Sequence, residues 1–124
     1  MTGASRPRAV LFACVHNAGR SQMAAALFNA RVDATMARAV SAGTQPASAV
    51  HPVVVEVMRE VGIDLSQARP QLLTHELAST ASLLVTMGCG EACPFVPGLQ
   101  TLDWPLPDPK GQSLEVVRAL RQEI

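Results

Sequence analysis

The stretch Cys14-Val15-His16-Asn17-Ala18-Gly19-Arg20-Ser21 decides how the rest of the chain is interpreted. An apolar run, residues 9–13, precedes it, and a helix-favouring segment, residues 22–28, follows it. This order predicts a strand, a tight loop and a helix, with the loop lying over the helix N-terminus. The first N–H groups of a helix have no intrahelical acceptor and the helix dipole is positive there, so this loop is suited to bind an anion.

The side chains at the two ends of the loop indicate nucleophilic chemistry on an oxyanion. The same field stabilises a thiolate at Cys14, and the guanidinium of Arg20 can bind two oxygens of the anion at once. Ser21 can donate its hydroxyl to the thiolate or cap the helix. A buried structural cysteine followed by a helix cap is the alternative, but it leaves the five-residue spacing unexplained. With Cys14 as the nucleophile, the predicted oxyanion-binding residues are Val15, His16, Asn17, Ala18, Gly19, Arg20 and Ser21.

Length and composition set limits on the class of protein. The chain has 124 residues, a size typical of one domain. Hydrophobic residues make up 48% and aromatic residues 3%, so the core must be built mainly from aliphatic side chains and methionine. Basic and acidic residues are balanced at 10 each, which gives no indication of a nucleic-acid partner. The sequence contains neither an apolar run of membrane-spanning length nor a signal-peptide pattern, which predicts a cytoplasmic protein without membrane association.

Strand and helix patterns alternate along the chain. After a flexible leader at residues 1–8, strands are expected at 9–15, 37–41, 83–87 and 99–104, and helices at 21–32, 49–61, 73–79 and 113–124. Pro52 is expected inside the first turn of its helix. This alternation predicts a single α/β domain over residues 1–124 with a parallel sheet.

Residues 14–24, Cys-Val-His-Asn-Ala-Gly-Arg-Ser-Gln-Met-Ala, resemble the anion-binding loop of the low-molecular-weight protein tyrosine phosphatase family, and its arsenate reductase branch in particular. The string Ser-Ala-Gly-Thr-x-Pro at 41–46 is similar to another segment of that family. The resemblance extends from residue 9 to about residue 124 and implies a four-stranded parallel sheet in the order 2-1-3-4. It also implies that Asp108, followed by Pro109, is the general acid, with Asp103 as the competing carboxylate. An aspartate that only shapes a proline-rich turn is the alternative.

Cys89 and Cys93 distinguish between a reductase and a phosphatase. Phosphatase chemistry needs one thiol, whereas reduction of arsenate to arsenite needs two electrons, which a pair of thiols can supply. The resemblance therefore implies an arsenate reductase for arsenic detoxification, in which Cys14 attacks arsenic and Cys89 and Cys93 complete a redox-active disulfide relay. The alternatives are a phosphatase acting on phosphotyrosine or small phosphoesters, and a non-enzymatic oxyanion sensor. Tyrosine phosphatases of this fold usually carry aromatic residues near the pocket mouth to bind phosphotyrosine. Here the late loop carries only Phe95 and Trp104 and the chain has no tyrosine, which favours a small inorganic substrate, arsenate or a similar oxyanion.

The spacing of the two later cysteines departs from the thioredoxin-coupled reductases. In those relatives six residues usually separate them; here there are three, and the string Met-Gly-Cys-Gly-Glu-Ala-Cys-Pro at 87–94 resembles an actinobacterial variant. Thioredoxin is the expected electron donor, and a low-molecular-weight thiol with its redoxin is the alternative.

No cofactor and no metal ion are expected. Ala25 occupies the position of a glutamate that some relatives use for a potassium ion. A zinc site formed by the two later cysteines with His16 or His75 is the less favoured alternative, because the sequence contains no second ligand pair at a suitable spacing.

Overall fold

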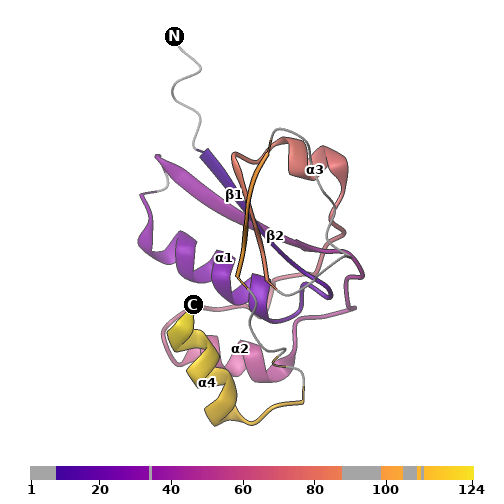
Figure 1. The fold of residues 1–124 in the computed structure, drawn as a ribbon. Coiled ribbons are helices and arrows are strands. Elements are labelled where there is room, and N and C mark those ends of the chain that lie inside the picture. The colour runs from indigo at the N-terminus through magenta and orange to yellow at the C-terminus, as the bar shows by residue number, and fades with distance from the viewer. Residues whose placement is uncertain (1–7, 34, 88–98, 105–108, 110) are drawn as a thin grey trace.

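A four-stranded parallel sheet organises the protein. The computed structural model describes residues 8–33, 35–87, 99–104, 109 and 111–124. Its strands are β1 (Arg8–Cys14), β2 (Ala37–Gly43), β3 (Leu83–Thr86) and β4 (Gln100–Asp103), in the order β2-β1-β3-β4 (Figure 1). The helices are α1 (Arg20–Arg31), α2 (Pro52–Arg59), α3 (His75–Ser79) and α4 (Leu114–Glu123). The predicted fold class and strand order are confirmed.

Strand β1 lies inside the sheet and positions the loop that follows it. Cys14, its last residue, pairs with Gly43 on one side, and Ala13 pairs with Thr86 on the other. A parallel strand that is covered on both faces needs apolar side chains without alternation, and the last four residues of β1 are all buried. The carboxyl ends of β1, β2 and β3 therefore meet at one edge, where parallel sheets place their ligand sites.

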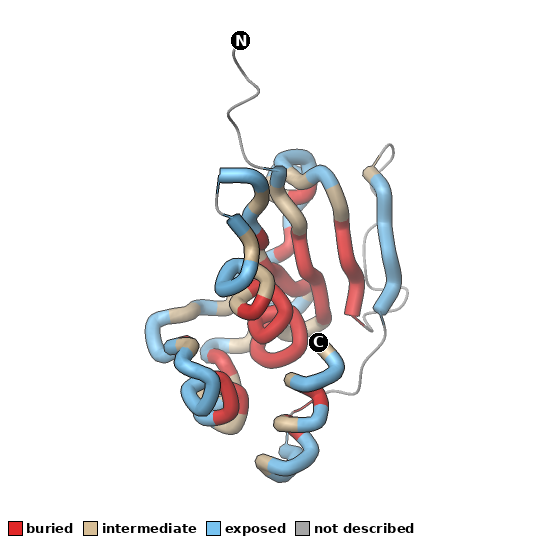
Figure 2. Tube along the Cα trace, turned by 90° about the vertical axis from the view of Figure 1, so that its left-hand side faces the viewer, coloured by how far each residue is buried: buried red, intermediate tan, exposed pale blue. Residues whose placement is uncertain are grey.

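The core has two layers, one on each face of the sheet (Figure 2). Helices α1, α2 and α4 cover the face that carries Phe12 and Val85, whereas α3 packs on the face that carries Leu11 and Leu84. Aliphatic side chains and methionines fill both layers, as the composition predicts. The expected core methionines are fully buried: Met23, Met58 and Met87.

Helix α2 begins three residues later than the sequence pattern predicts. The residue before a proline avoids helical dihedrals, and His51 accordingly has ψ 132° and stands as the N-cap of a helix whose first residue is Pro52. The helix ends at Arg59, and Gly62 follows with φ 81°, a left-handed conformation suited to glycine. The prediction of a helix over 49–61 was therefore too long at both ends.

Other boundaries also differ from the predictions by one or two residues, and hydrogen bonds explain two of them. Helix α3 begins at His75 rather than at residue 73, because the Thr74 hydroxyl accepts the Leu77 amide at 3.0 Å and caps the helix. Arg8 belongs to β1 rather than to the leader, since its amide donates to the Met36 carbonyl at 3.1 Å. Residues 1–7 lie outside the described residues. Within the described ranges, no helix combines the length and apolar character needed to cross a membrane.

Candidate active site

Cys14 and Arg20 stand at the two ends of the predicted anion loop. Cys14 closes β1, and α1 begins at Arg20 with Gly19 as an N-cap that offers no side-chain hydrogen bond. Both side chains are buried, with exposed fractions of 2% and 7%. The predicted order of strand, loop and helix is present, with Cys14 as the last residue of β1 and Arg20 as the first residue of α1.

The carbonyl groups of residues 14–18 all accept hydrogen bonds. Four of them accept backbone amides, as follows: Cys14 from Thr44 at 3.3 Å, Val15 from Gln45 at 2.8 Å, His16 from Ala47 at 2.9 Å, and Ala18 from His51 at 2.9 Å. The fifth, that of Asn17, accepts the side-chain amide of Gln22 at 3.1 Å. The segment after β2 and the first turn of α1 therefore fix the direction of every peptide in the loop.

The amides of residues 15–19 point away from the groups that bond these carbonyls. The N–H and the C=O of a trans peptide point in opposite directions, and these peptides are trans. Among the described residues, none of these five amides donates to a backbone carbonyl. Successive amides aimed at one point form a nest that favours an anion.

Asn17 holds the loop in shape. Its φ of 51° lies in the left-handed region, which asparagine tolerates better than most residues. Its side-chain Oδ1 accepts the backbone amide of Gln71 at 2.9 Å, and its Nδ2 donates to the Ser21 hydroxyl at 2.8 Å. Through its side chain, Asn17 thus joins the loop to the Gln71 backbone and to Ser21.

The same network leaves the Ser21 hydroxyl hydrogen available to the Cys14 sulfur. A backbone amide can only donate, so Gln71 fixes which end of the Asn17 amide faces Ser21. The Ser21 oxygen accepts from Asn17 and lies 2.9 Å from the Cys14 Sγ. Its own hydrogen is therefore available to donate to the sulfur. Of the two roles predicted for Ser21, the structure shows the hydrogen bond with the sulfur.

Two glycines allow close contacts around the loop. A Cβ at Gly43 would lie 2.5 Å from the Val15 carbonyl oxygen and 2.9 Å from the Asn17 amide nitrogen. A Cβ at Gly19 would lie 2.4 Å from the Cγ of Pro109, whose side chain is fully buried. The end of β2 and the segment at Pro109 are therefore packed directly against the loop.

The remaining predicted site residues are placed as follows. Val15 and His16 are half-buried in the loop, and Ala18 is fully buried. Asp103, at the end of β4, accepts the Thr86 hydroxyl at 2.8 Å. Cys89, Cys93 and Asp108 lie outside the described residues. In the described part of the chain, no group of three or more histidine, cysteine, aspartate or glutamate residues could hold a metal ion.

Gln22 and Gln71 contribute to the site although the sequence analysis did not single them out. Their partners are backbone groups and the Asn17 side chain, and residues 17 and 71 are far apart in the chain. No spacing pattern identifies such contacts. The position of Gln22 directly after the Arg-Ser pair was the one available indication.

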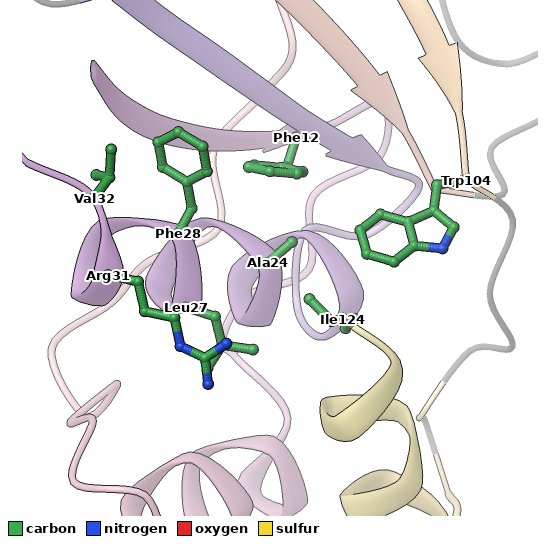
Figure 3. Close-up of a pocket in the computed structure, with 8 residues that line it drawn as sticks. All are labelled: Phe12, Ala24, Leu27, Phe28, Arg31, Val32, Trp104 and Ile124. Atoms are coloured by element: carbon green, nitrogen blue, oxygen red, sulfur yellow. The ribbon is translucent and has the colours of Figure 1, made fainter. Parts of the chain in front are cut away.

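A pocket of about 390 Å³ lies apart from the anion loop, between α1, β1, the end of β4 and the last residue (Figure 3). Its lining is apolar except for the guanidinium of Arg31 and the indole N–H of Trp104. The residues that line it are Phe12, Ala24, Leu27, Phe28, Arg31, Val32, Trp104 and Ile124. None of them offers a nucleophile, so the chemistry predicted from the sequence belongs to the loop.

Comparison with known proteins identifies the family. The family model for low molecular weight phosphotyrosine protein phosphatase matches residues 9–124, and the chain belongs to this family. The glutaredoxin arsenate reductase of Synechocystis sp. is 36% identical over 118 residues, covering 93% of this chain and 88% of that protein.

Solved structures of related proteins have the same fold. The thioredoxin-dependent arsenate reductase of Corynebacterium glutamicum is 40% identical with a TM-score of 0.78, covering 97% of this chain. This chain spans 59% of the length of that protein's chain. An arsenate reductase in the phosphate-binding state is 33% identical with a TM-score of 0.80, covering 94% of this chain and 89% of that chain.

Proposed function

We propose that this protein is an arsenate reductase that converts arsenate to arsenite through a nucleophilic cysteine and a disulfide relay. The observation that carries the proposal is the loop itself, whose carbonyls are all bonded on their own side and whose Cys14 sulfur lies 2.9 Å from the Ser21 hydroxyl. Relatives named arsenate reductase, at 36% and 40% identity, support arsenate as the oxyanion.

In the first step, the tetrahedral oxyanion binds to the amides of residues 15–19 and to the guanidinium of Arg20. The Cys14 thiolate attacks arsenic, forming a sulfur–arsenic bond while one arsenic–oxygen bond breaks. The departing oxygen takes a proton from Asp108 and leaves as water. Arsenic remains in the +5 state at this point. The assignment of Asp108 rests on the Asp-Pro sequence and on the contact of Pro109 with Gly19.

In the second step, the Cys89 thiolate attacks the Cys14 sulfur. A Cys14–Cys89 disulfide forms, and the electron pair of the sulfur–arsenic bond stays on arsenic, which leaves as arsenite in the +3 state. The Cys93 thiolate then attacks the Cys89 sulfur and releases Cys14, leaving a Cys89–Cys93 disulfide. In sum, arsenate and two thiols give arsenite, water and one disulfide.

An external dithiol must reduce the final disulfide. Thioredoxin is the donor we propose, because a structural relative at 40% identity is thioredoxin-dependent. A low-molecular-weight thiol with its redoxin is the alternative, and another relative is a glutaredoxin arsenate reductase. Both donors are consistent with a protein of the reducing cytoplasm. Arsenite production with thioredoxin and its reductase, compared with glutathione or mycothiol systems, distinguishes the two.

A phosphatase is the second candidate function. The anion loop and Asp108 suffice for hydrolysis of a small phosphate ester through a phosphocysteine intermediate. The family match supports this activity as well. Cys89 and Cys93 have no role in it, so these two cysteines distinguish the candidates.

A single turnover without reductant tests the relay. We expect one arsenite and one disulfide per chain in the native protein. Cys93→Ser should trap a Cys14–Cys89 disulfide, and Cys89→Ser should release no arsenite. Hydrolysis of an aryl phosphate serves as the control, because it needs neither later cysteine and should survive both changes. Peptide mapping identifies the disulfides. Three free thiols and no arsenite after exposure to arsenate would reject the reductase and leave the phosphatase.

A further inference from the structure

The side-chain amide of Gln22 is buried at a point where three carbonyl oxygens converge. Its Nε2 lies 3.1 Å from the Asn17 backbone oxygen, 3.2 Å from the Asn17 Oδ1 and 3.3 Å from the Arg69 backbone oxygen. The Gln22 side chain is in the first turn of α1 and is 7% exposed. One nitrogen thus connects the anion loop with the segment that joins α2 to α3.

Two of these contacts control groups that face the oxyanion. The Asn17 carbonyl belongs to the same peptide as the Ala18 amide, so a donor that holds the carbonyl outward directs the amide into the nest. This peptide follows a residue with φ 51°, a conformation that needs support from its surroundings. The contact with Asn17 Oδ1 keeps the Asn17 Nδ2 on the Ser21 hydroxyl, and Ser21 in turn faces the Cys14 sulfur.

We infer that Gln22 is a positioning residue for the oxyanion site, which aims the Ala18 amide and, through Asn17, orients the Ser21 hydroxyl that bonds the Cys14 sulfur. Its hydrogen bonds go to Asn17 and Arg69, so it acts on the site through Asn17. Loss of its two N–H donors leaves the Asn17 carbonyl without the contact that orients it. The inference assumes the anion-binding role of the loop and deepens the proposed function, but it does not require that arsenate be reduced.

The test replaces Gln22 with methionine, which keeps the length of the side chain and removes the donors. The readouts are the rate of Cys14 alkylation by iodoacetamide, followed by peptide mapping, its pH profile, and protection of Cys14 by inorganic phosphate. We expect alkylation of Cys14 at pH 7 to slow and the phosphate concentration for half-protection to rise, each by about tenfold, the effect of one lost hydrogen bond.

Asn29 provides the matched control on the same helix. Its side-chain amide also joins α1 to backbone groups of another element, donating to the Ala39 carbonyl at 2.9 Å and accepting the Ala39 amide at 2.7 Å. Asn29→Ala should lower the melting temperature and leave both Cys14 readouts unchanged. The inference would be overturned if the Cys14 alkylation rate of Gln22→Met stayed within twofold of the native rate. It would also be overturned if the two variants changed the Cys14 readouts equally.

Two further measurements apply if Gln22→Met does not fold. Gln22→Asn is neutral and keeps an amide that is one methylene too short to reach the three oxygens, so it should show the same loss. In the native protein, the side-chain N–H protons of Gln22 should exchange with solvent far more slowly than those of the exposed Gln67, and phosphate should shift their resonances. Exchange as fast as that of Gln67 would contradict the role. A native protein that fails to reduce arsenate but shows Gln22-dependent protection rejects the reductase alone.

Discussion

The two halves of helix α1 differ in what they bury. In the first turn, Arg20, Ser21 and Gln22 are buried polar residues, and the last two are hydrogen-bonded to the anion loop or to its cysteine. In the second half, Leu27 and Phe28 line the apolar pocket, while Arg31 is exposed (Figure 3). A polar group is costly to bury unless it is hydrogen-bonded. The first turn therefore buries polar side chains that bond the loop, whereas the other half serves packing.

The largest expected effect on activity comes from replacing the arginine at the start of this helix with lysine, and the arginine at its end provides the control. Arg20→Lys keeps the charge but removes the planar pair of donors, so kcat/KM for arsenate, or for an aryl phosphate, should fall by about 10²–10³-fold. Arg31→Lys is the control and should stay within twofold, because Arg31 is exposed at the other end of the helix and not in the loop. Activity of Arg20→Lys within a few-fold of the native protein would show that Arg20 does not bind the anion.

Replacing Gly43 with alanine tests whether the loop needs its close contact with β2, and the same change at Gly62 is the control. Gly43→Ala places a methyl group 2.5 Å from the Val15 carbonyl oxygen, so loop or strand must move. The stability loss should be about 1–3 kcal/mol, and phosphate protection of Cys14 should weaken. Gly62→Ala, at φ 81° with open space around it, should lose about 1–2 kcal/mol and keep full phosphate protection. Equal protection in the two variants would mean that the contact with Gly43 does not shape the loop.

The sequence was sufficient to predict the elements that depend on local pattern. The continuous apolar run of β1, the spacing of Cys14 and Arg20, and the alternation of strands with helices led to the fold class and to the position of the loop. The errors occurred at the ends of elements, where a single capping contact determines which residue comes first or last. Thr74 and Pro52 each set a helix start that hydrophobic periodicity does not reveal.

The parts of the site that escaped prediction depend on contacts across the chain. The backbone amide of Gln71 donates to the Asn17 side chain, and almost any residue type at position 71 could do the same. The residue type therefore does not predict this contact. Gln22 bonds two oxygens of Asn17 and one of Arg69, and the last is brought close only by folding of the segment after α2. From sequence alone, a glutamine in a helix is expected to be a surface residue. Gly43 lies within a string that is similar to the family. The reason that a glycine is needed there is the close approach of the Val15 carbonyl oxygen, a contact between segments that are distant in the sequence.

The smallest expected effect concerns stability. It comes from the ion pairs that Glu60, at the end of α2, forms with α4. Glu60 accepts two hydrogen bonds from Arg118 Nε and Nη2 at 2.9 and 2.6 Å, and one from Arg121 at 3.0 Å. The hydrogen bonds from Arg118 are the main cause that lowers the pKa of Glu60 from 4.5 to about 2, with a smaller contribution from Arg121. Because the folded pKa is the lower one, the contribution to stability is full above pH 4.5 and is lost as the pH falls toward 2.

Glu60→Gln measures this contribution directly. At pH 7 the variant should melt at a slightly lower temperature than the native protein, since ion pairs exposed to solvent contribute little. The difference should shrink as the pH is lowered from 4.5 to 3, because the native protein loses the benefit that the variant never had. Added salt at pH 7 should also reduce it. Phosphate protection of Cys14 should be unchanged throughout, since the hydrogen bonds of the Glu60 carboxylate in the described structure all come from α4 side chains. A melting difference that stays constant down to pH 3 would show that Glu60 stabilises the contact between α2 and α4 by packing rather than by its charge.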